Sequence, residues 1–382
     1  MKRLAVFDYN VTAMSPIGSC VRAEVGGICD EFDVTVFAHH FENPRPDRIR
    51  WVRVPCPSWP LIFREWVFAL LSPLLLRREV LLRGPFDIIQ ATEGQFTGCD
   101  ICYAQFCHRA YMRNQWRIAG DKGLRRIARW IGHTRNAHRE RLSFSHAKAV
   151  VVPSKGLEQE VLRVYPFLSG KIVNIPNAVD VERFARPADC DVAELRRGWS
   201  FTPDHAVIVF VALGDFGRKG LRVLLEGASM VASERLRILV VGGSEGEIGE
   251  YEQIADSLGI KKKVYFSGLT KDIRPFLWAS DVFAFPTAYE TFSLVAFQAA
   301  AAGLPLMVTP VYGIEDLIRH GVNGWSIERT PESIKHAVEA ALGDRARLVA
   351  MGKVAQLEAQ KYDVAGFPDS WMRLLRQMHS ER

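Results

Sequence analysis

Two cationic side chains stand next to each other in a glycine-rich stretch that directly follows an apolar run. Arg218 and Lys219 lie within residues 214–221, after the predicted strand 206–212. Gly217 and its neighbouring glycines let a ligand approach the backbone, and a helix predicted from about Gly220 offers free N–H groups and a positive dipole end. The stretch predicts a cradle for a diphosphate. A solvated turn with two surface cations is the alternative that these residues alone leave open.

A carboxylate follows a second apolar run, 282–285, in a tight loop before another predicted helix. Glu290 and Gln298 are eight positions apart, just over two helical turns, so both are expected on similar sides. The helix start should provide a second anion site, because its first amides have no partner within the helix. A sugar hydroxyl is a sensible partner for Glu290. The backbone amides expected to form this anion site are those of Phe292, Ser293 and Leu294.

These residues need two series of strands and helices to position them. The first half opens with a strand at 4–8, a loop through Gly18, a helix to about residue 27 and a strand at 33–38, which is the opening of a nucleotide-binding parallel sheet. Further short apolar runs in this half read as buried strands. They lie at 49–54, 88–90, 101–106 and 149–152.

The second half repeats the alternation of strands and helices after Gly170. Two doubly wound α/β domains follow, 1–167 and 168–382, with a hinge near 165–172 and ligands expected at the open ends of both sheets. The predicted strands lie at 173–175, 206–212, 237–241, 263–266, 282–285 and 306–308. The predicted helices lie at 221–232, 249–258, 273–278, 293–302, 313–320, 331–342 and about 369–377.

Over residues 148–330 the chain resembles the retaining glycosyltransferases of the GT-B fold, family 4, also called glycosyl transferases group 1. Residues 214–220 look most like the lipopolysaccharide core glucosyltransferase type. The resemblance is weaker in the first half, where it rests on Gly18 and His108. The motifs that carry it are 175–180 with Phe184, the Arg-Lys-Gly loop, the segment 290–298, then 301–306, Gly313 and 321–325.

The resemblance implies an α/β GT-B architecture of two Rossmann-like domains that face each other across a cleft. Domain 1–167 would bind the acceptor and domain 168–382 the nucleotide-sugar, with the last helix, about 362–382, packing back on the first domain. The implied residue roles concern the donor. Arg218 and Lys219 would hold the diphosphate, and Gly217 and Gly18 would line its phosphate side. Glu290 would contact the sugar hydroxyls, and His108 would face the donor sugar. Gly268 and Leu269 would meet the base.

Several positions depart from the family pattern. Gln298 stands where the family usually has a second glutamate for the ribose hydroxyls, and a neutral amide loses the strength of a charge-assisted bond. Ser293 and Ala178 each replace a usual glycine, and Leu213 lies near a usual arginine. His108 has a structural alternative as well, because a histidine after an apolar strand is commonly a hydrogen-bonded framework residue.

The expected activity is transfer of a sugar, best a hexose such as glucose from a UDP-sugar, to a cell-envelope polysaccharide or lipopolysaccharide acceptor. Such a reaction needs no side-chain nucleophile, since positioning and stabilisation of the departing diphosphate supply the catalysis. No cofactor is expected, and no metal, because cations and helix starts take its place. Two alternatives stay open: a catalytically silent membrane-associated scaffold, and a nucleotide-sugar epimerase or sugar-phosphate synthase on the same fold.

Positive charge is concentrated in the first half. Residues 1–167 carry 24 Lys and Arg against 16 Asp and Glu, and residues 109–141 carry ten against two, interleaved with Trp116, Trp130 and other apolar residues. This mixture predicts a surface for anionic lipid headgroups. A packed amphipathic helix with a solvated basic face is the alternative, and no motif for nucleic acid accompanies it. The apolar run 66–76 is expected to be a buried helix, with an interfacial segment as the second interpretation.

Length and composition place the chain among globular proteins. It has 382 residues, 48% hydrophobic and 24% charged, and no apolar run long enough to span a bilayer. An acidic residue at position 8 comes too early for a signal peptide, so a peripheral location on the cytoplasmic face of the inner membrane is expected. Seven irregularly spaced cysteines fit a reducing compartment. Cys99 and Cys102 would point to opposite faces of a strand, which favours inert thiols over a metal site.

Overall fold

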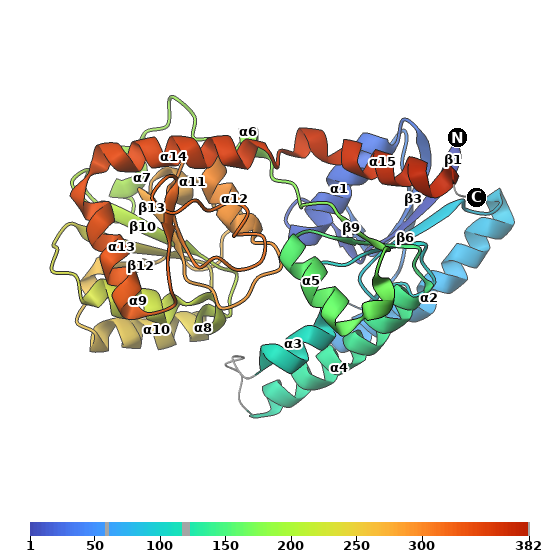
Figure 1. Cartoon of the computed structure of the whole chain (residues 1–382), viewed down its shortest axis with the longest axis horizontal. Helices are drawn as coiled ribbons and strands as arrows, with labels where there is room; N and C mark the ends of the chain where they lie inside the picture. The colour runs from blue at the N-terminus through green and yellow to red at the C-terminus, as the bar shows by residue number, and fades with distance from the viewer. Residues whose placement is uncertain (58–60, 117–122, 381–382) are drawn as a thin grey trace. The chain divides into compact units, whose positions relative to one another are not determined.

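The computed structural model describes residues 1–57, 61–116 and 123–380, without the side chains of residues 61, 62, 124, 125, 379 and 380 (Figure 1). The described chain forms two compact units. The first contains the chain up to Ala178 and the segment from Val364 onwards, and the second is Val179–Asp363. The predicted boundary at 167 therefore lies eleven residues too early, because the strand at 172–174 pairs within the first sheet.

The first unit is built on a seven-stranded sheet in the order β5-β3-β1-β6-β7-β8-β9, and every neighbouring pair is parallel. Its inner strand AVVV at 149–152 is a continuous, fully buried apolar run, as expected where helices cover both faces of a parallel sheet (Figure 1). The chain moves outward from β1 to β3 and β5, then crosses to β6 on the other side. The strands are β1 (Lys2–Phe7), β3 (Phe32–Ala38), β5 (Arg50–Arg53), β6 (Ile88–Thr92), β7 (Ile101–Tyr103), β8 (Ala149–Val152) and β9 (Ile172–Asn174).

Six helices belong to the first unit, among the residues that the model describes there. The last of them, α15, packs on α1, and Trp371 is fully buried with its ring 5.0 Å from that of Tyr103. A short two-stranded sheet joins β2 (Asn10–Val11) to β4 (His40–Phe41). The helices are α1 (Pro16–Ile28), α2 (Leu61–Arg83), α3 (His108–Asn114), α4 (Gly123–His146), α5 (Lys155–Val164) and α15 (Phe367–Ser380).

The second unit has a six-stranded parallel sheet in the order β12-β11-β10-β13-β14-β15. Its strands are β10 (Ala206–Val211), β11 (Leu236–Val241), β12 (Val264–Phe266), β13 (Val282–Phe285), β14 (Leu306–Val308) and β15 (Gly324–Ser326). Its helices are α6 (Val181–Phe184), α7 (Val192–Arg197), α8 (Phe216–Lys219), α9 (Leu221–Ser229), α10 (Glu245–Ser257), α11 (Arg274–Trp278), α12 (Leu294–Ala301), α13 (Pro331–Gly343) and α14 (Arg345–Gln360). These parallel sheets and their helices confirm the predicted pair of Rossmann-like α/β units.

Two predictions in the second unit are wrong. Residues 313–320 form turns instead of a regular helix, because Gly313 has a positive φ of 81° and the Asn323 side chain binds the turn backbone. That side chain accepts from the Arg319 amide at 2.7 Å and donates to the Leu317 carbonyl at 2.8 Å. The sequence analysis also missed α14, which packs on α12.

The apolar run 66–76 lies in the longer helix α2, and only one side of that helix is buried. Phe68 is 2% exposed, whereas Trp66, Leu70 and Leu74 are more than half exposed. The expectation of a buried helix is therefore wrong for its outer face. In the described ranges, no helix combines the length and apolar character needed to cross a bilayer.

Candidate functional site

The loop after β10 forms the one-turn helix α8 between two residues in left-handed backbone conformation. Asp215 has φ 60° and Gly220 has φ 88°. A Cβ atom on Gly220 would lie 2.0 Å from the Pro286 carbonyl oxygen, so only glycine lets this loop pack against the end of β13. That close approach brings the Arg-Lys pair and the loop with Glu290 together at the carboxyl ends of β10 and β13.

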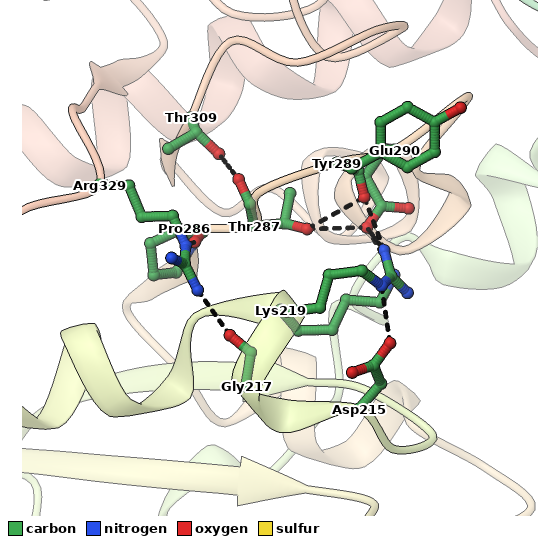
Figure 2. Close-up of polar contacts among 10 residues, drawn as sticks. Asp215, Gly217, Lys219, Pro286, Thr287, Tyr289, Glu290, Thr309 and Arg329 are labelled. Carbon is green, nitrogen blue, oxygen red and sulfur yellow. Dashed lines mark hydrogen bonds and ion pairs between the residues drawn. The ribbon is translucent and has the colours of Figure 1, made fainter. Parts of the chain in front are cut away.

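Arg218 and Lys219 both contact Glu290 and form one compact charged cluster with it. Figure 2 shows Lys219 pointing toward Glu290. Lys219 Nζ lies 2.5 Å from Glu290 Oε1, and Arg218 Nη1 lies 3.5 Å from the same oxygen. Arg218 also donates to Asp215 Oδ2 at 2.7 Å and to the Tyr289 carbonyl at 2.6 Å. The side chains of the three residues are 11–18% exposed. The alternative of two cations on a solvated turn does not fit this burial.

Burial sets the electrostatics of the cluster. Desolvation lowers the pKa of Lys219, the neighbouring Arg218 charge acts in the same direction, and Glu290 opposes both. Two adjacent cations share one carboxylate oxygen of Glu290, and the second carboxylate, Asp215, contacts Arg218. An incoming diphosphate would therefore meet cations that are already fixed in position.

Three residues that sequence reasoning missed brace this cluster. The Thr287 hydroxyl donates to Glu290 Oε1 at 3.0 Å, and the Thr309 hydroxyl donates to the Thr287 carbonyl at 2.6 Å. Arg329 donates to the carbonyls of Pro286 at 3.1 Å and Gly217 at 2.5 Å, which ties the two loops together (Figure 2). Thr287 has a local signal, since it follows a strand three residues before Glu290. Nothing near Thr309 or Arg329 in the sequence marks them as part of the cluster.

The start of α12 lies directly after this loop. Ser293 is its N-cap residue, is 3% exposed, and its hydroxyl has no hydrogen-bond partner in the described part of the chain. The Leu294 amide donates to the Phe292 carbonyl at 3.2 Å, outside the helix, and the anion site expected from the amides of 292–294 stays a prediction. Glu290 precedes the helix, and the helical spacing assumed between Glu290 and Gln298 is therefore wrong.

The positions expected near the base lie after β12. Gly268 has a positive φ of 72°, and its carbonyl accepts from the Gly242 amide at 2.9 Å, which joins the ends of β11 and β12. Leu269 is 64% exposed. Gly217 lies inside α8, where its Cα faces the Tyr251 hydroxyl. The second unit thus has its predicted donor residues in the loops and helices that follow β10, β12 and β13, with Gln298 inside α12.

Gly18 lies in the first turn of α1, and the loop before it ends at Ser15. Its amide donates to the Ser15 hydroxyl at 3.1 Å, and a Cβ atom here would lie 2.0 Å from the Asn10 carbonyl oxygen. The expected loop ending at Gly18 is thus wrong by three residues. Glycine is required here for the close packing of α1 on the segment after β1.

His108 begins α3 in the first unit and is hydrogen-bonded on several sides. Its Nδ1 lies 3.0 Å from His133 Nδ1, its Nε2 lies 3.8 Å from Glu93 Oε2, and its amide donates to Glu140 Oε2 at 2.6 Å. Burial disfavours the charged imidazole, but Glu93 and Glu140 outweigh it and raise the pKa of His108. Burial and the adjacent His108 charge lower the pKa of His133 to about 4. The role of His108 toward a donor sugar stays a prediction.

The described residues contain no group of three or more His, Cys, Asp or Glu side chains arranged to hold a metal ion. All seven cysteines are free thiols. Cys99 and Cys102 interact with each other, and this contact together with burial raises the pKa of Cys102. The expectation that they point apart is wrong, because Cys99 precedes β7 and is not part of a strand.

The basic segment 109–141 covers α3 and most of α4; its residues 117–122, which include Ile118, lie outside the described residues. On α4 the large apolar residues Ile127, Trp130 and Ile131 are 49–56% exposed, and Arg126 beside them is exposed. Apolar and basic side chains therefore share the outer face of this helix.

Comparisons with known proteins agree with this geometry. Residues 29–183 match the family model described as Glycosyltransferase Family 4, and residues 205–344 match that of Glycosyl transferases group 1. An uncharacterized glycosyltransferase of Methanocaldococcus jannaschii is 30% identical over 210 residues, which cover 54% of this chain and 53% of that protein. The chain thus aligns with about half the length of this curated relative.

Two solved structures share the fold at low identity. WaaG, a glycosyltransferase involved in lipopolysaccharide biosynthesis, has a TM-score of 0.74 at 20% identity over 96% of this chain and 97% of that one. Anabaena HepE in complex with UDP-glucose has a TM-score of 0.74 at 15% identity over 99% of this chain and 100% of that one. With a glycosyltransferase model matched in each half and the GT-B fold throughout, the chain belongs to the group 1 and family 4 glycosyltransferases.

Proposed function

We propose that this protein is a retaining, metal-independent glycosyltransferase that moves a hexose from a UDP-sugar to a glycan or glycolipid acceptor of the cell envelope. The observation that carries the proposal is the buried cluster of Arg218 and Lys219 around Glu290 Oε1. Cations fixed in a site of low water content stabilise a leaving diphosphate far better than solvated ones. The UDP-glucose bound by HepE and the lipopolysaccharide role of WaaG support the donor and acceptor classes.

The proposed reaction breaks the bond from the sugar C1 to the diphosphate and forms a bond from C1 to the acceptor oxygen on the same face. The acceptor proton passes to the departing diphosphate, so no protein base is needed. Arg218 and Lys219 stabilise the developing negative charge. The diphosphate replaces Glu290 as their counter-ion, which frees the Glu290 carboxylate to accept hydrogen bonds from sugar hydroxyls. The unpartnered Ser293 hydroxyl at the start of α12 gains a partner at the same time.

Nucleotide recognition follows from the neighbouring loops. Gly268 and Leu269 meet the base, and Gln298 binds the ribose hydroxyls through neutral hydrogen bonds. His108 contacts the donor sugar. No cofactor takes part in this scheme.

We further propose that the protein works on the cytoplasmic face of the inner membrane. The basic face of segment 109–141 attracts anionic headgroups, and Trp130 with Ile127 and Ile131 enters the interface. Cosedimentation with phosphatidylglycerol vesicles tests this: Trp130→Ser with Ile131→Ser should release the protein, and neutral phosphatidylcholine vesicles should bind it weakly. Equal binding to both vesicle types would contradict an anionic partner.

Acceptor-free turnover tests the enzymatic proposal. Incubated with UDP-glucose, the protein should release UDP slowly, and Glu290→Ala should stop that release. Glu226→Ala is the matched control, because Glu226 forms an exposed ion pair with Arg222 at 2.9 Å on α9. A thermal-shift series over nucleoside diphosphates and their sugars then identifies the base.

The two alternatives give different results. A silent scaffold would show neither UDP release nor a thermal shift with any nucleotide. An epimerase or sugar-phosphate synthase would convert the nucleotide-sugar alone or with a free sugar phosphate, and product analysis would detect the new sugar.

A further inference from the structure

The first unit contains a pocket of about 280 Å³ at the carboxyl ends of its central strands. Asp8 follows β1, and Glu93, Gly94 and Gln95 follow β6, so both strand ends contribute to its wall. The chain leaves β1 and β6 toward opposite edges of the sheet, which makes this the topological switch point, the place where open parallel sheets bind ligands. Its volume is at the lower end for small-molecule sites, about 300–1,000 Å³, and suits a single sugar or polyol.

Two polar groups in this pocket lack the partners that burial normally demands. Asp8 is 4% exposed; one carboxylate oxygen accepts from the Asn10 amide at 2.9 Å and the Thr92 side chain interacts with the carboxylate, but Oδ2 makes no hydrogen bond of normal geometry in the described part of the chain. Arg64 on α2 lies with its guanidinium 4.0 Å from the centre of the Tyr9 ring, and its Nε is likewise buried without a partner among the described residues. Buried polar atoms without partners are costly unless a ligand satisfies them.

The other two arginines of the pocket have partners. Arg139 donates to the carbonyls of Gly94 at 2.7 Å and Gln95 at 3.1 Å, which holds the loop after β6. Arg135 is paired with Glu65. Arg64 is thus the pocket arginine that donates to no carbonyl or carboxylate among the described residues. The start of α1, with Ser15 and Ile17 in the pocket wall, adds the positive end of a 13-residue helix.

We propose that this pocket binds the terminal sugar or polyol of the acceptor, and that this group carries a phosphate or carboxylate. Arg64 recognises the anionic group, and a hydroxyl of the ligand donates to Asp8 Oδ2. The proposal rests on the proposed transferase function and names the substrate class of its acceptor side. A guanidinium placed over an aromatic ring can still form two parallel bonds to such an anion. An uncharged sugar would leave this guanidinium without a counter-ion.

Calorimetric titration of the full chain tests the proposal with defined probes. The probes are glucose, glucose 6-phosphate, glucuronate, glycerol 3-phosphate, inositol phosphate and inorganic phosphate. At least one hydroxylated phosphate or carboxylate should bind about tenfold or more tightly than glucose, the difference expected for one charge-assisted contact. It should also bind more tightly than inorganic phosphate, because the Asp8 contact needs a hydroxyl.

Variants assign the effect to the pocket. Arg64→Ala should weaken the best probe about tenfold or more, and Arg64→Lys should restore part of the affinity because it keeps the charge. Arg48→Ala is the control: Arg48 is exposed, belongs to the same unit and pairs with Asp30 at 3.4 Å outside the pocket. Circular dichroism of each variant confirms that it is folded, and the comparison of glucose with its phosphate needs no variant at all.

Three results would overturn the proposal: glucose binding as tightly as every anionic probe, no saturable binding of any anionic probe, or Arg64→Ala binding like the wild type. Its failure is separable from that of the transferase function, which is tested by UDP release from UDP-glucose without acceptor. Wild-type protein that releases UDP but ignores the anionic probes retains the transferase function and loses the anionic acceptor.

Discussion

The two units differ in whether the charged groups of their candidate sites have partners within the protein. In the second unit, Arg218, Lys219, Asp215 and Glu290 form ion pairs of 2.5–3.5 Å and leave no net charge. In the pocket of the first unit, buried polar atoms of Asp8 and Arg64 lack partners among the described residues. A ligand of the second unit must replace Glu290 or Asp215 as the partner of the two cations. A ligand of the first unit would instead supply hydrogen-bond partners that Asp8 and Arg64 lack. If both proposals hold, the proposed donor site has its cations in place before binding, whereas the first unit should gain stability from its proposed ligand.

The largest expected effect comes from removing a cation of the second unit. Lys219→Ala should lower the kcat/KM of UDP release from UDP-glucose by about 10²–10³-fold, the loss typical of one electrostatic contact to a developing anion. The same change leaves Glu290 with the more distant Arg218 alone. Lys335→Ala, at a partly exposed pair with Glu339, is the control. Turnover within twofold of the wild type would show that the cluster is structural.

The next effect separates the stability of the two units. Gly18→Ala places a Cβ atom 2.0 Å from the Asn10 carbonyl and should destabilise the first unit by about 1–3 kcal/mol through overpacking. Hydrogen exchange should rise in α1 and its neighbours and stay unchanged in β10–β14. Gly246→Ala is the matched control with the opposite sign, because it adds a methyl group to open space inside α10 and should stabilise by about 0.4–1 kcal/mol. Uniform exchange across both units would refute their independence.

The smallest effect is a pH dependence of the stability of the first unit, which Glu24 on α1 should produce. Burial raises the pKa of Glu24 well above its ordinary 4.5, and its hydrogen bond from Gln90 at 2.9 Å opposes this only in part. Above pH 4.5 the unfolded chain loses this proton while the folded chain keeps it, so stability falls as pH rises from there through the folded pKa. Glu24→Gln removes this loss and should raise Tm by a few degrees at pH 8 and hardly at pH 4.5. Exposed Glu182→Gln should give no pH-dependent difference, and a parallel shift of both variants would contradict the assignment.

Sequence reasoning worked best where local pattern and tertiary structure agree. The strands at 282–285 and 306–308 match their predicted limits. In both, the apolar run between turn residues is too short for a helix and therefore indicates a buried strand. Arg218, Lys219 and Glu290 were found because each follows such a strand. Arg329 was not, since it reaches Gly217 from 112 positions away and nothing near it in the sequence marks that contact. The outer face of α2 was misread for a related reason: an apolar run does not show which of its sides meets the core.

The return of the chain to its first unit has a consequence for biosynthesis. Trp371 fills the interior of that unit against Tyr103, yet in the sequence it follows the whole of the second unit. A ribosome releases residues in order, so the second unit, which ends at Asp363, has all its parts before the unit that was begun first. The nascent first unit must wait with an unfilled interior until the segment after Asp363 has been made, and it is the unit that chaperones should hold longest.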